Sequence, residues 1–201
     1  DMPDKSEYEI DASPIAYLNM TTQQLSKSGN SAIGATYNYI NIWPEYQVVP
    51  TTQKLVNTPI FHTANFYWHK KLKNGMIKYY TSFSHNQLGV EKQDVDSLYL
   101  NDYFHVKNNN WYNNLNWTQN LGHRWKIIWA NSFSINADDI NSMVRNQHEV
   151  PVTFDEPVFW MNNKIFDYTN TTDNLQSRLV LEKKFSHLNA VRFGGEYDYD
   201  H

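Results

Sequence analysis

The residues best suited to chemistry in this chain are its histidines and its adjacent carboxylates. The sequence has eight His and no Cys, which excludes thiolate metal sites, disulfides and Cys nucleophiles. His62 and His69 lie seven positions apart, an odd spacing that puts them on opposite faces of a strand, whereas metal ligands must converge at about 2 Å. The pairs Asp138-Asp139 and Asp155-Glu156 lack the spacing of a calcium loop. We therefore expect no metal site.

Catalytic motifs are also missing from the sequence. It contains no Gly-rich phosphate loop, nucleophile elbow or His-Glu-x-x-His helix. A hydrolase would need a Ser or an Asp beside a His on one wall of the fold, and no such set can be assembled. His105 and His148 fall in regions expected to be long loops, where solvated side chains are the rule and haem or metal ligands the exception. We expect a protein that is not an enzyme and holds no cofactor.

Composition favours an all-β chain. The 201 residues include 14 Tyr, 7 Trp and 10 Phe, and only 19% are charged, which suits one sizeable domain built from strands. The formal net charge of -4 argues against a nucleic-acid binder. No apolar run reaches the roughly 20 residues of a membrane helix. A strand of a membrane barrel needs only about 9 to 11 residues, half of them polar.

Alternating polarity predicts strands with two different faces. Residues 125–135 carry Trp, Ile, Trp, Phe and Ile at odd positions, interrupted by Asn131, with mostly small or polar residues between them. The same alternation recurs in 175–185 and 191–199, where the second face is charged. We expect seven antiparallel strands, at Ala32 to Trp43, Thr63 to Leu72, Met76 to Leu88, Trp111 to Asn120, Arg124 to Ile135, Asn174 to Phe185 and Asn189 to Tyr199.

The expected connections alternate in length. The short ones are Lys73-Asn74-Gly75, Leu121-Gly122-His123 and Ser186-His187-Leu188. The long ones are residues 44–62, 89–110 and 136–173. Strict alternation puts every tight turn at one end of the sheet and every long loop at the other, as in outer-membrane barrels with short periplasmic turns and long extracellular loops. Connections in a β-sandwich instead mix hairpins with crossovers between sheets.

In a membrane barrel the apolar faces would meet lipid and the charged faces would line a wet lumen. Amphipathic rings prefer the depth of the headgroups, and the expected lipid-facing girdle comprises Tyr37, Tyr39, Phe66, Trp68, Tyr79, Phe83, Trp117, Trp125, Trp129, Phe185, Tyr197 and Tyr199. The expected lumen lining comprises Asn65, Lys78, Asn114, Asn116, Lys126, Arg178, Glu182, Arg192 and Glu196, with Glu182 and Arg192 paired across the last hairpin. The alternative is that the aromatic residues form the core of a soluble sheet.

Residues 14–23 resemble the segment that ends the plug domain of TonB-dependent outer-membrane receptors. Leu18-Asn19-Met20 and Thr22 fit its hydrophobic-Asn-hydrophobic-x-Thr pattern, whereas Gln23 stands where Lys is usual and an upstream Gly is missing. The polar segment 26–30 leads into a small-residue opening similar to first strands in the family, and 191–197 is similar to a mid-barrel strand. The Asn- and Tyr-rich style resembles receptors of the Bacteroidetes group.

This resemblance implies a section of a larger receptor in the outer membrane of a Gram-negative bacterium. Residues 1–30 would be the end of the plug and its linker, and residues 31–201 the first seven strands of a barrel of about 22. Seven strands cannot close an antiparallel barrel and would leave open edges in hydrocarbon. The remaining strands, and the segment that contacts the TonB energy complex, would lie outside this sequence. Implied partners are outer-membrane lipid and a surface lipoprotein or other outer-membrane subunits, and not nucleic acid.

The implied function is active uptake of a bulky nutrient such as a siderophore, haem, cobalamin, a glycan or a peptide. Cargo contacts are expected from the aromatic residues of the long loops, namely Trp43, Tyr46, Tyr103, Phe104, His105, Phe159, Trp160 and Met161. One alternative is a passive porin, in which Tyr8 to Gln23 would be a strand of the wall and not a strand inside the lumen. The other is a soluble carbohydrate-binding β-sandwich, which would need no detergent.

Overall fold

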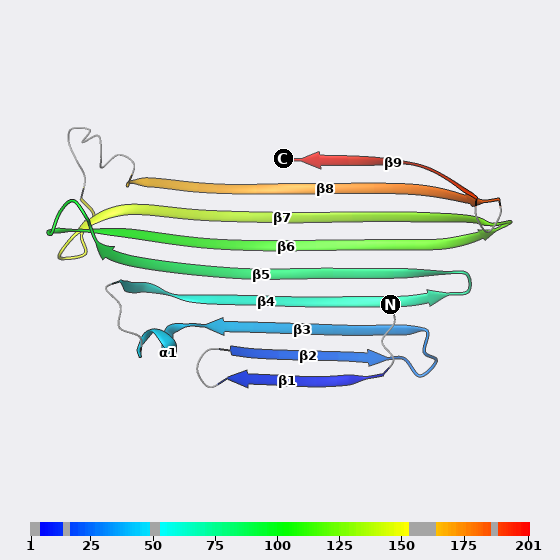
Figure 1. Ribbon diagram of the computed structural model, residues 1–201, viewed down its shortest axis with the longest axis horizontal. Coiled ribbons are helices and arrows are strands. Elements are labelled where there is room, and N and C mark those ends of the chain that lie inside the picture. Colours follow the sequence, from blue (N-terminus) through cyan, green and yellow to red (C-terminus); the bar gives the residue numbers. More distant parts are fainter. Residues whose placement is uncertain (1–4, 14–16, 49–52, 153–163, 186–188) are drawn as a thin grey trace.

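The chain forms one antiparallel sheet of nine strands, paired in the order in which they occur in the sequence (Figure 1). The computed structural model describes residues 5–13, 17–48, 53–152, 164–185 and 189–201. Its elements are β1 (Glu7–Ser13), β2 (Tyr17–Leu25), β3 (Ser31–Asn41), α1 (Trp43–Tyr46), β4 (Lys54–Leu72), β5 (Gly75–Gln93), β6 (Leu100–Gly122), β7 (Trp125–Asn146), β8 (Phe166–Lys184) and β9 (Ala190–Asp200). The predicted all-β class is confirmed. The sheet is open, with β1 and β9 at its edges.

The two ends of the sheet differ in how they connect the strands. At the right-hand end of Figure 1, which we call the turn end, residues 73–74 join β4 to β5 and residues 123–124 join β6 to β7. At the opposite end, the loop end, residues 42–53 lie between β3 and β4 and residues 147–165 between β7 and β8. The two tightest turns among the described residues thus lie at the turn end, but the strict alternation is wrong, because only residues 94–99 separate β5 from β6 at the loop end.

The turn between β6 and β7 lies one residue later than the sequence predicted. His123 and Arg124 have φ of 47° and 64°, and two consecutive positive φ angles match the right-handed twist of a two-residue hairpin. Gly122 has φ of 87° at a register shift, so this glycine forms a bulge and the next two residues close the turn. The predicted turn at Lys73-Asn74-Gly75 is confirmed in position, although Gly75 is the first residue of β5 and neither Asn74 nor Gly75 has a positive φ. Ser186-His187-Leu188 lies outside the described residues.

The strands extend far into the segments predicted to be long loops, so loops 44–62, 89–110 and 136–173 are wrong in their extent. β4 begins at Lys54, β6 at Leu100 and β8 at Phe166, while β5 reaches Gln93 and β7 reaches Asn146. The reason is that backbone pairing continues where the apolar alternation stops. Polar side chains bridge these strands, as where the Nδ2 amide of Asn108 donates to Asn136 Oδ1 at 2.8 Å and to Asp138 Oδ1 at 2.6 Å.

Residues 7–25, predicted to belong to the end of a plug, form the first two strands of the same sheet. Tyr17–Leu25 pairs in continuous register with residues 32–40 of β3, and β1 pairs in turn with β2. Apolar side chains alternate along both strands, at Ile10 and Met20 for example, so they extend the two-faced pattern of the other strands. The described residues of Tyr8 to Gln23 thus continue the sheet, and their place in a barrel wall, which the porin alternative predicts, stays a prediction.

The sheet is a single layer, so most large apolar side chains have no protein core to enter. Few hydrophobic residues are buried, among them Ala32, Tyr103 and Val144. Large apolar residues such as Phe83 and Phe193 are about half exposed, at 48% and 54%. Contiguous exposed apolar surface of this kind marks an interaction with another protein or with a membrane. The fold of the chain therefore depends on what covers this surface.

Close packing at Gly34 gives a direct test of the register. Tyr67 lies opposite Gly34, and its hydroxyl donates to Gln23 Oε1 at 3.1 Å, so the ring crosses the glycine. A Cβ on Gly34 would lie 2.2 Å from the Tyr67 ring. We predict that Gly34→Ala displaces Tyr67 and destabilises the folded protein by about 1–3 kcal/mol, measured by urea unfolding in detergent.

The matched control is Gly195→Ala, because a Cβ there meets no atom within 4 Å. This variant should be neutral or slightly stabilising, since it only reduces the entropy of the unfolded chain. Equal stability of the two variants would contradict the packing of Tyr67 on Gly34.

Candidate functional site

The register of the sheet gathers the predicted girdle on one side, which we call the aromatic face. Trp68 lies opposite Tyr79, and Trp117 opposite Trp129. Every girdle residue within a strand belongs to this face, and Phe185 directly follows β8; the full set is Tyr37, Tyr39, Phe66, Trp68, Tyr79, Phe83, Trp117, Trp125, Trp129, Phe185, Tyr197 and Tyr199. The shared face is confirmed, and contact with lipid stays a prediction.

The apolar part of the aromatic face is a band of limited height. On β7 it runs from Trp125 to Ile135, which matches the roughly 9 to 11 residues of a strand that crosses a bilayer. Toward the loop end the band is followed by a polar row that contains His62, His85 and Asn109. In this row His85 Nδ1 lies 2.6 Å from Asn109 Oδ1, and the neighbouring hydroxyl of Tyr37 lies 2.7 Å from His62 Nδ1.

The opposite side, which we call the charged face, carries all the residues predicted to line a lumen. These are Asn65, Lys78, Asn114, Asn116, Lys126, Arg178, Glu182, Arg192 and Glu196. The predicted pair is confirmed, with Arg192 Nε 2.5 Å from Glu182 Oε2. Glu182 is 2% exposed, and a buried carboxylate of this kind requires its cationic partner.

Near the middle of β4 to β6 the charged face carries uncharged hydrogen-bonding groups, while Asp198 and Asp200 of β9 bring acids to the same rows. The hydroxyl of Tyr80 donates to Asn65 Oδ1 at 2.8 Å, and Asn114 Nδ2 donates to the hydroxyl of Tyr112 at 3.1 Å. The Tyr80 and Tyr112 rings lie 6.1 Å apart between centroids. This surface suits water and uncharged polar groups.

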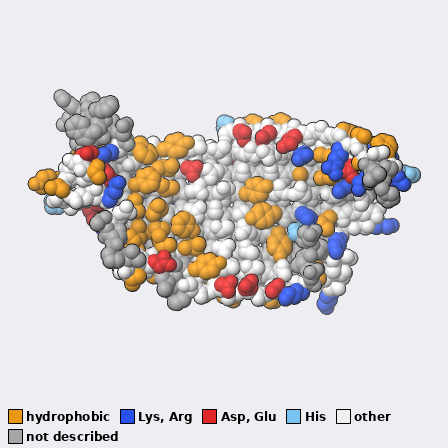
Figure 2. All heavy atoms as spheres, viewed as in Figure 1, with side chains coloured by type: hydrophobic (Ala, Val, Ile, Leu, Met, Phe, Trp, Pro, Cys, Tyr) orange, Lys and Arg blue, Asp and Glu red, His pale blue; other side chains and the backbone are white. Residues whose placement is uncertain are grey.

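Toward the loop end the two faces exchange character. The charged face there carries rows of apolar residues across β5 to β8, which we call the loop-end patch: Leu88, Val90, Phe104, Val106, Ile140, Phe166 and Tyr168. One residue away along the strands, the aromatic face carries Gln87, Lys107, Asp139 and Thr169. Figure 2 shows hydrophobic side chains gathered toward the loop end at its left, and Lys and Arg toward the turn end at its right.

The predicted cargo contacts do not form a single cluster. Trp43 and Tyr46 lie in α1, and β4 and β5 separate the strand before that helix from β6. Tyr103 and His105 stack on the aromatic face, with 6.5 Å between ring centroids, whereas Phe104 lies on the other face within the loop-end patch. Phe159, Trp160 and Met161 lie outside the described residues. Cargo binding by any of these residues stays a prediction.

Tyr103 differs from the expected exposed loop aromatic. It lies within β6, is 7% exposed, and has the guanidinium carbon of Arg145 3.7 Å from its ring centroid. Arg145 also approaches the buried carboxylate of Glu91, with 3.8 Å between Nη1 and Oε2. The ring is therefore occupied by a cation–π contact and is not free to stack on a ligand.

A cluster of acids around Lys164 closes the loop end. Lys164 Nζ lies 2.5 Å from Asp94 Oδ2, 3.0 Å from Asp96 Oδ2 and 4.0 Å from Asp102 Oδ1. Asp94 Oδ1 also accepts the backbone N–H groups of Asp96 and Ser97, at 2.6 and 3.0 Å. The cluster thus fixes the connection between β5 and β6 to the residue just before β8.

Burial and neighbouring charges shift the pKa values of the two aspartates of this cluster in opposite directions. Burial disfavours ionised Asp94, but the hydrogen bonds from Lys164 and from the Asp96 N–H outweigh it and lower the Asp94 pKa. Burial, followed by the hydrogen bond and charge of Asp94, raises the pKa of Asp102. The hydrogen bond to Asp94 raises the pKa of Lys164. At neutral pH the cluster is a charged clamp.

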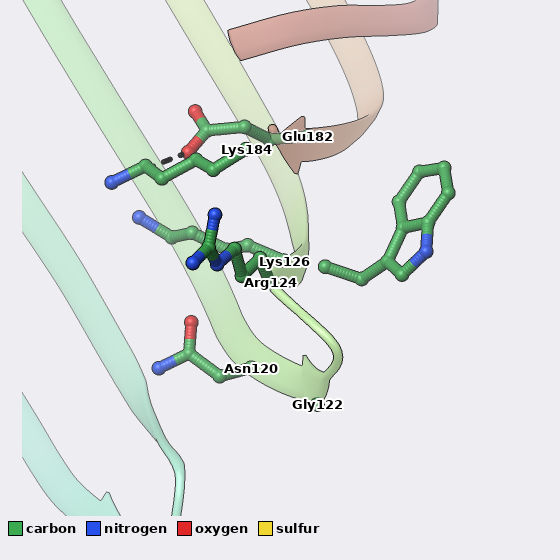
Figure 3. Close-up of a pocket in the computed structure, with 7 residues that line it drawn as sticks. Asn120, Gly122, Arg124, Lys126, Glu182 and Lys184 are labelled. Atoms are coloured by element: carbon green, nitrogen blue, oxygen red, sulfur yellow. Dashed lines mark ion pairs between the residues drawn. The ribbon is translucent and has the colours of Figure 1, made fainter. Parts of the chain in front are cut away.

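A pocket of about 330 Å³ lies at the turn end, beside the hairpin of β6 and β7 (Figure 3). Its lining combines three cationic side chains, one acid and one amide, and comprises Asn120, Gly122, Arg124, Trp125, Lys126, Glu182 and Lys184. In Figure 3 the side chains of Arg124, Lys126 and Lys184 project to the same side of the sheet as that of Asn120.

Metal and membrane-helix features are not found in the part of the chain that the structure describes. No group of three or more His, Cys, Asp or Glu side chains is placed to hold a metal ion among these residues. No helix within the same ranges is long and apolar enough to cross a membrane. Comparison with known proteins gave no match to a family model, a curated protein or a solved structure.

Sequence reasoning missed the loop-end patch, the Lys164 cluster and the turn-end pocket. The patch had a signal, because apolar residues alternate at Leu88 and Val90 and again at Phe104 and Val106, but all of them except Leu88 lay inside a segment assigned to a loop. Lys164 and Asp94 are 70 positions apart, and the pocket joins residues of β6, β7 and β8. Only the pairing of the strands brings these groups together.

The Lys164 cluster predicts local stability at the loop end. Lys164→Met leaves the buried Asp94 carboxylate without its cation, and we expect opening of residues 94–99 to become easier by about 2 kcal/mol. Hydrogen exchange at the Asp96 and Ser97 amides measures this change. Lys107→Met removes a lysine from the opposite face of β6 and serves as control; equal protection in both variants would contradict the clamp.

Proposed function

We propose that this chain is a section of the wall of an outer-membrane β-barrel that takes up a bulky nutrient. One observation carries the proposal: over a band of membrane height, one face of the sheet is aromatic while the other is charged. A barrel wall between lipid and a wet lumen requires this combination. A single-layer sheet in water would instead leave its aromatic face exposed.

The open edges agree with a section of a larger wall. Among the described residues β1 pairs with β2 alone and β9 with β8 alone, and an open sheet edge is not tolerated in hydrocarbon. Strands from outside the described residues would have to pair with both edges before the wall could enter a membrane. A soluble carbohydrate-binding sandwich, by contrast, would need a second layer packed on Trp111, Phe133 and their neighbours.

The long strands and the loop-end patch favour a receptor over a simple pore. Beyond the apolar band, β6 and β7 continue to Leu100 and Asn146, so the wall would project well outside the bilayer. There the lumen side carries the apolar loop-end patch, whereas a water-filled channel has a polar lining. This patch would contact the apolar part of a bulky cargo, with Phe104 near its centre.

TonB-dependent energisation rests on the resemblance of residues 31–37 and 191–197 to barrel strands of those receptors. Because β1 and β2 pair into the same sheet as β3, the proposal places the plug and the TonB-contacting segment elsewhere in the protein. The same pairing favours the second candidate, a passive porin. The partners of the proposal are outer-membrane lipid, the TonB complex and a surface lipoprotein or other outer-membrane subunit.

Membrane residence is tested by extraction. We predict that the native protein stays in the outer-membrane fraction after washing with alkaline carbonate and is released only by detergent, because the aromatic face is covered by acyl chains. A soluble sandwich would be released by the wash. The membrane assignment would therefore be contradicted if the protein were recovered in the supernatant, monodisperse and without detergent.

Conductance separates the two uptake mechanisms. A receptor whose lumen is blocked by a plug should give no steady conductance when the intact native protein is inserted into planar lipid bilayers. A porin should give stable open channels whose conductance rises with salt concentration. Open channels would therefore contradict TonB-dependent uptake while leaving the barrel wall intact.

A further inference from the structure

The turn-end pocket has more positive charge than its acid can balance. Glu182 is its single carboxylate, and this side chain is already paired with Arg192 and lies 3.8 Å from Lys184 Nζ. Lys126 is directly opposite Glu182 in the ladder between β7 and β8. Arg124, Lys126 and Lys184 therefore share one partly neutralised carboxylate, and the hollow between them attracts anions.

The backbone holds two of these cations in place. Arg124 has φ of 64° in the two-residue turn, and its Nη1 donates to the Phe185 carbonyl at 2.6 Å. The Lys184 N–H donates to the Arg124 carbonyl at 3.0 Å, which joins the turn to the end of β8. One of the five guanidinium donors is used in this way among the contacts of the described residues. The turn and the end of β8 thus bring the main chain of both residues to the pocket.

We propose that the turn-end pocket binds a phosphate group. A phosphate dianion matches three cations against one carboxylate better than a singly charged carboxylate does, and Arg offers it paired N–H donors. The Asn120 side chain adds a neutral donor at the rim. The volume of about 330 Å³ leaves room for part of the molecule that carries the phosphate. This chemistry is independent of what covers the aromatic face.

Calorimetric titration of the detergent-solubilised protein with inorganic phosphate tests the site. We expect saturable binding that weakens as salt is added. Lys126→Gln and Lys184→Gln should each raise the Kd about tenfold. Lys107→Gln removes the same charge from the aromatic face of β6 and should leave the Kd unchanged. Equal weakening by all three variants would show a general charge effect and overturn the site.

A variant that binds phosphate more tightly distinguishes a specific site from a variant that simply fails to fold. Glu182→Gln keeps the shape of the side chain and removes the acid of the pocket, so phosphate should bind more tightly, by about tenfold. Unchanged or weaker binding by this variant, with its thermal unfolding intact, would overturn the proposal.

A parallel arm identifies the source of the phosphate. Vesicles of phosphatidic acid in phosphatidylcholine replace inorganic phosphate as the probe, with the same variants. Tight binding of inorganic phosphate alone assigns the site to a soluble phosphate ester, and binding of the vesicles alone assigns it to a lipid headgroup. Failure of both probes to bind contradicts the proposal.

Discussion

Backbone pairing along very long strands is the constraint on which the rest of this structure depends. Each ladder between β5 and β8 runs without a break for most of its length, so the side of the sheet that every side chain occupies is fixed by its position alone. A single layer provides no interior. Whatever surrounds the two faces must therefore suit an aromatic band on one side and charges on the other, and the lipid and the wet lumen of our proposal would meet this requirement.

Local turns and side-chain contacts maintain the register of these strands. Gly122, His123 and Arg124 form the bulge and turn that set β7 against β6. The amides of residues 108 and 136 continue the pairing where apolar contacts end, and the Lys164 clamp fixes the loop end. The exchange of polarity beyond the band agrees with the proposal: outside a bilayer the aromatic face would meet water, and the apolar side chains would lie on the enclosed face.

The sequence supported the prediction of everything that depends on short-range alternation. The alternation from Trp125 to Ile135 predicted the aromatic face, and Asn74-Gly75 predicted a hairpin. The charge pattern of the last two strands predicted the pairing of Glu182 with Arg192. The sequence could not show how far the strands extend, because Asn and Asp ladders have no hydrophobic period. Residues 7–25 were assigned to the end of a plug on the basis of a short motif, and their pairing with β3 in one sheet was not predicted. The pocket and the clamp needed the tertiary pairing of distant strands.

Contact between the aromatic face and acyl chains is the central claim, and quenching by brominated lipids tests it most directly. The chain has no Cys, so single cysteines at Leu179 and Val180, neighbours on opposite faces of β8, can carry a bimane label in bilayers brominated along the acyl chain. The account predicts strong quenching at position 179 and little at position 180. Equal quenching at both positions, or none at 179, would contradict it.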